Sequence, residues 1–471
     1  MCGVIGIIKK DGDVAGELLL GMNLIQHRGQ DACGIITACG NEIYSKRQKG
    51  MVDDLLLNID MSELKGSMGI CHTRYPTAGG LQNGDTQPFR VNSTKKVSMA
   101  HNGNITNYLE LGNILKEHGV FLSSFVGIEP VIKIFAYEYE KHNDFFKAAE
   151  EIMRRVEGSY SVVGTIGEKG IFAFRDPYGI RPLLMGKKEG SFIFASESVV
   201  LQTLGFEYVR DVEAGEAILI SEDKVGIAKE QFIVQSKIID QRNIAHCMFE
   251  WIYFARPDSI IEEKAVYSAR LELGKAIASR MDPKDVDIVI PVPDSGRSSA
   301  IGIAEGLGVK YREGIVKNRY VGRTFIMPTQ ELREQSVSIK LNPVISEIQG
   351  KSIVVVDDSI VRGTTSKRII DMIRKAKPRK VTFVSICPPV KYPCFYGVDF
   401  LTEDELIASN KTIEEIREYI GADELIFGTI QDVESVIGKP LCYACLNGRY
   451  PTMIKQEQID HMKNDNRNNR C

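Results

Sequence analysis

The pattern of hydrophobic and polar residues differs between the two halves of the chain. In the first half, short β-rich runs mix with two helical patterns, around Val14–His27 and around Pro130–Tyr139. In the second half, apolar strands alternate with a helix along the chain: Ile288–Val292, Ser352–Val356, the helix Lys367–Lys375 and Val381–Ile386. The first half therefore predicts a layered α+β domain, and the second predicts an α/β domain with a doubly wound parallel sheet.

A largely polar stretch, Gln235–Asn243, separates the two patterns. We therefore expect one domain at residues 1–235 and a second at residues 236–455. Residues 456–471 are polar with little to bury, which predicts a mobile tail. The length agrees with this division, because 471 residues, 43% of them hydrophobic, can bury two or three separate cores.

Charge and apolar content limit the possible partners. The chain has 59 basic and 62 acidic residues, and this net charge of −3 indicates neither a nucleic acid nor a membrane surface as partner. Its start lacks a signal peptide, and no later apolar segment is long enough to span a bilayer. We expect a cytoplasmic protein.

Cys2 is the first candidate for chemistry. Removal of Met1 would leave a residue with both a thiol nucleophile and an α-amine that can act as its base. Taken alone, a cysteine at position two can also be an accident of sequence. Cys2 is accompanied, however, by a series of motifs with ordered spacing: Cys2–Ile7, His27–Asp31, His72–Gly79 and His101–Asn104. Together they resemble the N-terminal-nucleophile (Ntn) glutamine amidotransferases, in which a terminal cysteine releases ammonia from glutamine.

These motifs supply candidate substrate-binding and catalytic residues. Arg74 offers a fork of donors suited to the α-carboxylate of glutamine, although a surface ion pair would also explain it. Asn102 and the backbone N–H of Gly103 are candidates for the oxyanion hole, but Asn-Gly also favours a hairpin turn. By the resemblance, Arg28 and Gly29 join the glutamine site.

The sequence departs from the family pattern at one position. Relatives usually have Ser-Asp-Thr-Glu where this chain has Val126–Glu129, so Gly127 replaces the aspartate that holds the α-ammonium of glutamine. Loss of such a charge-assisted contact costs about 1.5–3 kcal/mol. Glu129 is a candidate substitute. Weak glutamine binding, or the use of free ammonia, is therefore an alternative.

A second constellation lies in Ile353–Ser366, where an apolar strand leads into two acids, a small-residue loop and a helix. Loop amides and a helix N-terminus favour a phosphate, and the acids suit ribose hydroxyls or Mg²⁺. An ordinary turn with an acidic N-cap is the alternative. The run resembles the 5-phosphoribosyl-1-pyrophosphate (PRPP) signature of type I phosphoribosyltransferases. The implied PRPP-binding residues are Asp357, Asp358, Ser359, Arg362, Gly363, Thr364, Thr365 and Ser366.

The family resemblance assigns two further segments to the PRPP site. Ser295, in the loop Pro293–Ser299, is expected near a Mg²⁺ that Asp357 and Asp358 also hold. The segment Lys317–Pro328 is cationic and contains Lys317 and Arg323, which are expected to bind PRPP. A similar segment closes over the substrate in relatives, whereas a solvated basic loop is the alternative.

The two halves in this order resemble the amidophosphoribosyltransferases. The resemblance implies an Ntn hydrolase domain followed by a type I phosphoribosyltransferase domain. It also implies glutamine-dependent synthesis of 5-phosphoribosylamine from PRPP, inhibition by purine nucleotides, and a homotetramer. An ammonia-dependent transferase with an impaired glutaminase and a PRPP-binding regulator are the alternatives.

Four cysteines form a possible ligand set: Cys247, Cys394, Cys442 and Cys445. Two separate cysteines and a Cys-x-x-Cys pair can supply four thiolates. The resemblance implies a structural [4Fe–4S] cluster at these positions, which some amidophosphoribosyltransferases have and others lack. A zinc site would use the same ligands, and buried free thiols are the remaining alternative.

Overall fold

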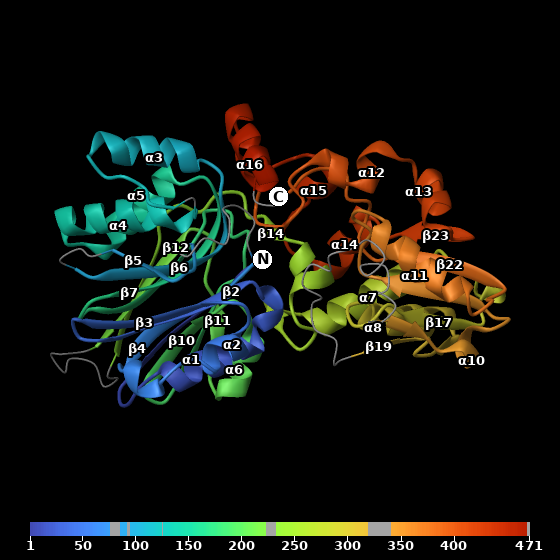
Figure 1. The fold of residues 1–471 in the computed structure, drawn as a ribbon, viewed down its shortest axis with the longest axis horizontal. Coiled ribbons are helices and arrows are strands. Elements are labelled where there is room, and N and C mark those ends of the chain that lie inside the picture. Colours follow the sequence, from blue (N-terminus) through green and yellow to red (C-terminus); the bar gives the residue numbers. More distant parts are fainter. Residues whose placement is uncertain (76–84, 92–94, 125, 223–231, 319–340, 469–471) are drawn as a thin grey trace.

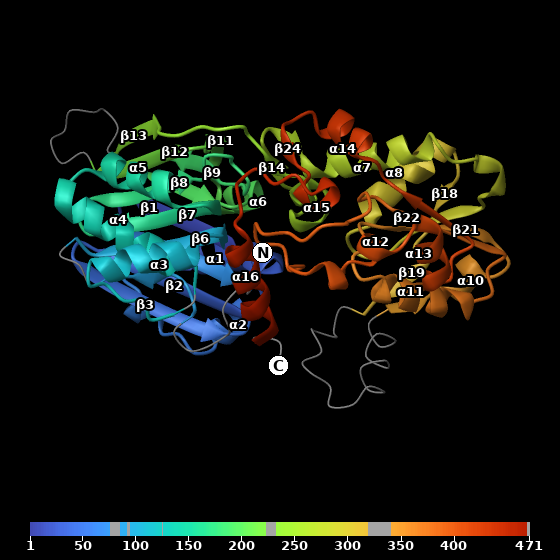
Figure 2. The same cartoon turned by 90° about the horizontal axis from the view of Figure 1, so that it is seen from above.

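The computed structural model describes residues 1–75, 85–91, 95–124, 126–222, 232–318 and 341–468. The first half of the chain forms a β-rich part, and the second half forms an α/β part beside it (Figure 1). The N-terminus lies near the junction of the two parts in both views (Figures 1 and 2). The start of the chain is therefore placed where the two parts meet.

The first part is a sandwich of two antiparallel sheets with helices on both outer faces. One sheet has, in order across it, β11 (Glu207–Asp211), β9 (Leu184–Lys188), β10 (Ser191–Ala195), β1 (Gly3–Lys9), β4 (Met68–Arg74), β2 (Ala32–Cys39) and β3 (Glu42–Lys49). The other has β13 (Phe232–Ile238), β12 (Glu216–Glu222), β8 (Gly170–Arg175), β7 (Gly158–Ile166), β6 (Val97–Ile105) and β5 (Phe89–Arg90).

Both faces of the inner strands are buried, which explains why they are continuously apolar. In β1, Val4 and Ile8 pack between the sheets, whereas Ile5 and Ile7 face the outer helices. The helices on this side are α1 (Ala15–Leu24), α2 (Val52–Leu56) and α6 (Ser198–Leu204), and those on the opposite side are α3 (Tyr108–Glu117), α4 (Ile128–His142) and α5 (Phe145–Arg155). The expected layered Ntn architecture is confirmed.

The second part is a parallel sheet covered by helices on both faces. Its strand order is β18 (Lys310–Tyr311), β17 (Ile288–Pro291), β21 (Ser352–Asp357), β22 (Lys380–Ser385) and β23 (Glu424–Phe427). One face packs on α7 (Val266–Ala278), α8 (Arg297–Leu307) and α14 (Ile430–Ile437), and the other on α11 (Thr364–Arg374) and α13 (Ile413–Ile420). The expected doubly wound sheet is confirmed.

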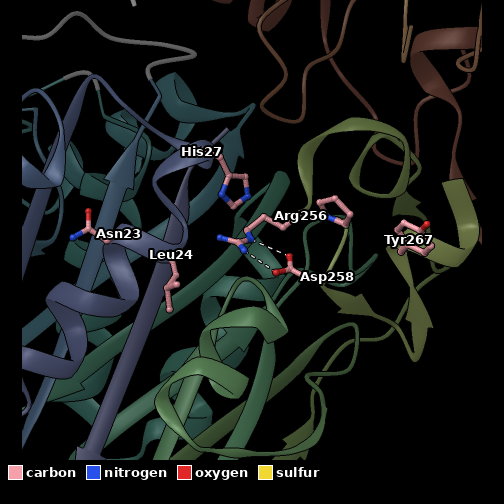
Figure 3. Close-up of a pocket in the computed structure, with 7 residues that line it drawn as sticks. Asn23, Leu24, His27, Arg256, Asp258 and Tyr267 are labelled. Atoms are coloured by element: carbon pink, nitrogen blue, oxygen red, sulfur yellow. Dashed lines mark hydrogen bonds and ion pairs between the residues drawn. The ribbon is translucent and has the colours of Figure 1, made fainter. Parts of the chain in front are cut away.

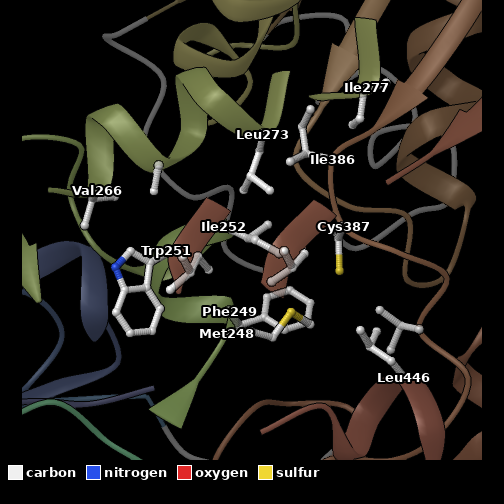
Figure 4. Close-up of a cluster of buried hydrophobic side chains, with 14 of the residues drawn as sticks. Met248, Phe249, Trp251, Ile252, Val266, Leu273, Ile277, Ile386, Cys387 and Leu446 are labelled. Atoms are coloured by element: carbon white, nitrogen blue, oxygen red, sulfur yellow. The ribbon is translucent and has the colours of Figure 1, made fainter. Parts of the chain in front are cut away.

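Several other elements are short. They are β14 (His246–Cys247) with β24 (Leu441–Cys442), β15 (Ile260–Ile261) with β16 (Lys264–Ala265), β19 (Ile315–Lys317) with β20 (Leu341–Pro343), and the helices α10 (Ile345–Ile348), α12 (Ile407–Asn410) and α15 (Ala444–Asn447). Strand β13 continues to Ile238 and so crosses the boundary expected at residue 235. At the junction, Trp251 and Phe249 belong to one buried apolar cluster with residues of α7 and with Leu446 (Figure 4).

The C-terminal segment differs from the expected mobile tail. Residues Gln456–Asn468 form the helix α16, and Met462 is buried against Phe395 and Leu401. The amide of Asn104 also donates a hydrogen bond to Met462 Sδ at 3.5 Å. A few apolar side chains within a polar sequence are therefore enough to hold this helix. Within the described residues, no helix is long and apolar enough to cross a membrane.

Candidate active sites

Cys2 lies where the two sheets of the first part meet. Its Sγ is 3.6 Å from the carbonyl oxygen of Tyr75, and its backbone nitrogen donates to Asn102 Oδ1 at 3.3 Å. Burial lowers the pKa of the α-amine, which here belongs to Met1, to about 6. After removal of Met1, the backbone nitrogen of Cys2 becomes the terminal amine, and in its neutral form it can accept the thiol proton.

Asn102 and Gly103 lie within β6 and are paired with Ser161 and Tyr160 of β7, so the hairpin-turn alternative is wrong. Because Asn102 Oδ1 accepts from Cys2, its Nδ2 remains as a donor, and this buried atom has no hydrogen-bond partner among the described residues. Gly103 has φ of +146°, and a Cβ there would lie 2.0 Å from the carbonyl oxygen of Ser159. Strand pairing therefore fixes both candidate oxyanion donors beside Cys2.

Arg74 ends β4, the strand next to β1, and its side chain is buried. Burial lowers the pKa of this guanidinium, while charge on Cys2, Asp85 and Asp31 opposes the shift. A Cβ at Gly29 would lie 2.5 Å from the backbone of Arg74, so only glycine fits there. Arg74 and Gly29 are thus brought together beside Cys2, whereas residues 76–79 of the same motif lie outside the described residues.

Arg28 also reaches Cys2, but with a backbone contact. Its Nε donates to the Cys2 carbonyl oxygen at 3.0 Å, and its other nitrogens bind Glu197 at 2.6 Å and Glu250 at 2.9 and 3.0 Å. All guanidinium nitrogens are thus engaged, and these carboxylates raise the pKa of Arg28 against the effect of burial. The sequence pattern missed Glu197, Glu250 and the neighbouring Arg181, because no local motif marks them.

Glu129 does not face the position left by the missing aspartate. Its carboxylate accepts from the backbone and hydroxyl groups of Ser123 and Ser124 at 2.7–2.8 Å, and it pairs with Lys133 at 2.6 Å. Glu129 therefore stabilises the loop before α4. A Cβ at Gly127 would lie 3.1 Å from the side chain of Ile105, so a larger residue there needs a small shift.

The expected phosphate loop joins β21 to α11. Asp357 ends the strand, and Gly363, with φ of +73°, precedes the first helical residue. The helix N-cap is thus a glycine, and the acidic N-cap alternative is wrong. Thr364, Thr365 and Ser366 form the first turn, whose free N–H groups point along the helix axis.

The two acids at the end of β21 are buried beside Ser295. Ser295 Oγ and Ser359 Oγ donate to the two oxygens of Asp358 at 2.5 and 2.6 Å. Burial raises the pKa of both Asp357 and Asp358, and the Asp358 charge raises that of Asp357 further. Two carboxyl groups held together in this way are suited to a divalent cation, which would relieve their repulsion.

The remaining basic candidates lie at the edge of this site. Lys317 is exposed and forms an ion pair with Asp294 at 2.7 Å. Arg362 forms an ion pair with Glu405 at 3.2 Å. Arg323 and the rest of the segment 319–328 lie outside the described residues.

A cavity of about 530 Å³ extends from Met1 to the loop between β21 and α11. On the glutaminase side it is lined by Met1, Arg28 and Tyr75, and on the other side by Ser295 and the loop residues 357–366. A separate cavity of about 660 Å³ lies near α1 (Figure 3). It is lined by Asn23, Leu24, His27, Arg256, Pro257, Asp258 and Tyr267. The first cavity is lined by both Met1 and the phosphate-loop residues, whereas the second is lined by neither.

The four candidate cluster ligands lie in one neighbourhood. Cys247 and Cys442 pair across β14 and β24, and the carbonyl of Cys445 accepts from Lys391 and Tyr392 near Cys394. Burial and the charges of the other thiols raise the pKa of Cys445 well above its usual value. In the described part of the chain, no three His, Cys, Asp or Glu side chains converge to hold a single metal ion.

Both halves of the chain match known protein families. Residues 72–203 match the model of a glutamine amidotransferase domain, and residues 268–393 match that of a phosphoribosyl transferase domain. Among curated proteins, the amidophosphoribosyltransferase of Methanothermobacter thermautotrophicus is 42% identical over 97% of this chain and 95% of its own length. Those of Escherichia coli and Saccharomyces cerevisiae are each 43% identical over 92% of this chain and 88% of their own lengths.

A solved structure agrees with these sequence matches. The glutamine PRPP amidotransferase of Bacillus subtilis, complexed with ADP and GMP, is 36% identical with a TM-score of 0.88. The match covers 97% of this chain and 98% of the Bacillus chain. The order of the two parts is therefore shared over the full length.

Proposed function

Because this chain belongs to the amidophosphoribosyltransferase family, we propose that it makes 5-phosphoribosylamine from PRPP with ammonia released from glutamine at Cys2. This reaction is the first committed step of purine synthesis. The cavity that extends from the N-terminus to the phosphate loop carries the proposal, because it brings the two candidate sites to one space through which ammonia could pass.

The glutaminase step uses groups within reach of Cys2. After removal of Met1, the α-amine of Cys2 takes the thiol proton, and Sγ attacks the amide carbon of glutamine. Asn102 Nδ2 and the N–H of Gly103 stabilise the oxyanion that forms. Collapse of this intermediate expels ammonia, and water then releases glutamate from the thioester. Arg74, with Gly29 packed on its backbone, holds the glutamine α-carboxylate.

The transferase step takes place at the end of β21. The N–H groups and hydroxyls of Thr364, Thr365 and Ser366 bind the 5-phosphate, and Gly363, Arg362 and Ser359 shape the loop. Ammonia attacks the anomeric carbon, and pyrophosphate leaves with the electrons of the C–O bond. Asp357, Asp358 and Ser295 would hold Mg²⁺, which neutralises charge on the leaving pyrophosphate. We propose that Lys317, at the edge of this site, also binds PRPP, and the family resemblance implies the same role for Arg323, which lies outside the described residues.

We also propose that Cys247, Cys394, Cys442 and Cys445 hold a structural [4Fe–4S] cluster. The four cysteines share one neighbourhood, in which the charges of the other thiols raise the pKa of Cys445. The family resemblance favours a cluster, which takes one thiolate at each of four irons, over a tetrahedral zinc ion, which the same ligands would also suit. Assay of iron and sulfide in anaerobically purified protein tests this. Stoichiometric zinc, or no metal, would contradict the proposal.

Regulation and assembly follow from the relatives by analogy. The Bacillus enzyme binds ADP and GMP, and we propose that purine nucleotides likewise inhibit this chain. We also propose a homotetramer, which the resemblance to the amidophosphoribosyltransferases implies. A reducing compartment such as the cytoplasm suits the chemistry, because Cys2 must remain a free thiol.

An ammonia-dependent transferase is the second candidate. The observation in its favour is that Gly127 offers no carboxylate to the α-ammonium of glutamine and that Glu129 is engaged by Ser123, Ser124 and Lys133. Such an enzyme would retain the phosphoribosyl site and use glutamine poorly.

One experiment separates these functions. Release of pyrophosphate from PRPP is measured under anaerobic conditions with glutamine or with ammonium chloride, for the wild type and for Cys2→Ala. We expect turnover with both donors, and loss of the glutamine rate alone in the variant. Turnover with ammonia alone would establish the second candidate. Absence of turnover with either donor, despite PRPP binding, would contradict both and favour a PRPP-binding regulator.

A further inference from the structure

A chain of buried charges connects Cys2 to the second half of the protein. Arg28 binds the Cys2 carbonyl through Nε at 3.0 Å and binds both oxygens of Glu250 at 2.9 and 3.0 Å. Glu250 belongs to the turn Glu250–Phe254, and its side chain is almost fully buried. The nucleophile of the first part is therefore fixed through a carboxylate that the second part supplies.

Glu250 also contacts a second buried arginine. Arg181 Nη1 lies 3.4 Å from Glu250 Oε1, and its Nε and Nη2 donate to the carbonyl oxygen of Tyr396 at 2.9 and 2.5 Å. Buried charges persist only when they are paired and hydrogen-bonded, so Glu250 helps to hold both arginines in place, together with Glu197 at Arg28. Glu250 is thus linked through Arg181 to the backbone carbonyl of Tyr396.

The Tyr396 carbonyl is connected by hydrogen bonds to β6, the strand that contains Asn102 and Gly103. It accepts from Ser159 Oγ at 2.9 Å, and Ser159 Oγ accepts from the backbone N–H of Asn104 at 3.2 Å. Asn104 directly follows Gly103, whose N–H is the proposed oxyanion donor. Glu250 is therefore connected to the Cys2 backbone through Arg28 and to the Gly103 backbone through Arg181 and Tyr396.

We propose that Glu250 is a positioning residue for the glutaminase step, which sets the distance between Cys2 and the oxyanion donors from across the domain junction. This inference rests on the proposed function, because it assumes that Cys2 attacks glutamine. Glu250 touches neither substrate, so its effect falls on the rate of the chemical step and not on glutamine binding.

The test compares Glu250→Gln with Glu262→Gln. Glu262 is a matched control, because it is also a carboxylate of the second part that pairs with a buried arginine of the first, Arg175, at 2.7 Å. In Glu250→Gln we expect the ratio of glutamine-dependent to ammonia-dependent kcat to fall by about tenfold to a hundredfold, with the KM for glutamine little changed. In Glu262→Gln we expect the wild-type ratio. An unchanged ratio in Glu250→Gln, or an equal fall in both variants, would overturn the proposal.

A second measurement does not depend on glutamine turnover. The rate at which iodoacetamide alkylates Cys2 is followed by mass spectrometry of the N-terminal peptide. Slower or faster alkylation in Glu250→Gln alone supports the positioning role, and equal rates in wild type and both variants overturn it. If the wild type uses only ammonia, the proposed function fails, while this alkylation comparison still decides whether Glu250 positions Cys2.

Discussion

The α-carbon of Gly103 faces the carbonyl oxygen of Ser159 so closely that a Cβ would lie 2.0 Å from that oxygen. The φ of Gly103, +146°, also lies in a region that side chains disfavour. We therefore expect Gly103→Ala to displace the oxyanion strand and to lower the glutamine-dependent rate about a hundredfold or more. Steady-state assays with both nitrogen donors measure this effect.

The control for Gly103→Ala is Gly16→Ala. Gly16 is exposed in α1, and an added Cβ there meets no atom within 4 Å. This variant should behave as the wild type with either donor. If Gly103→Ala keeps its full glutamine rate, Gly103 is not part of the oxyanion site.

Gly363 is expected to affect the other half-reaction. Its φ is +73°, and a Cβ there would lie 2.6 Å from Ile407 Cδ1 and 3.1 Å from the ring of Tyr419. Gly363→Ala should therefore distort the first turn of α11 and raise the KM for PRPP about tenfold or more, since the strained backbone alone costs about 1–2 kcal/mol. The increase should be the same with glutamine and with ammonia. A change seen with glutamine alone would contradict a role in PRPP binding.

Restoring the missing carboxylate at position 127 tests the glutamine site directly. Gly127→Asp places an acid at the N-terminus of α4, beside Ile105. A charge-assisted contact with the glutamine α-ammonium contributes about 1.5–3 kcal/mol, so we expect the KM for glutamine to fall about tenfold to a hundredfold. Gly127→Asn has the same size without the charge and should not lower it. Equal values for both variants would show that another group holds the α-ammonium.

The sequence predicted those features that depend on contiguous residues. The strand, loop and helix of the phosphate site were correctly located, because alternation of apolar strands with helices is a local pattern. The pair Asn102–Gly103 was compatible with a turn, but its position in a sandwich between two sheets overrides local turn propensity. No periodicity indicates which glutamates reach Arg28, since Glu197 and Glu250 are 169 and 222 residues away in the chain.

The helix α16 formed by the C-terminal residues also depends on contacts that are distant in the sequence. Composition predicted a polar tail, yet one buried methionine and the hydrogen bond from Asn104 hold α16 against the body of the protein. Such contacts depend on the surface that the rest of the fold presents. They cannot be derived from the composition of the segment itself.

The pH dependence of stability is expected to reflect His101. Burial, together with the charges of His72 and Arg74, lowers its pKa to about 3, whereas an unfolded chain titrates near 6.5. Between these values the unfolded state binds more protons than the folded state, so the free energy of unfolding falls as the pH falls. The stabilisation is complete above about pH 6.5 and decreases by about 1.4 kcal/mol for each pH unit below it.

Thermal unfolding between pH 5 and 7.5 tests this, with the wild type and His101→Gln compared at each pH. Glutamine does not titrate, so the variant should lose Tm less steeply as the pH falls. The buried His72, whose pKa is also lowered to about 3, should leave part of the slope in place. Parallel curves for the two proteins would mean that His101 is not kept neutral by its burial.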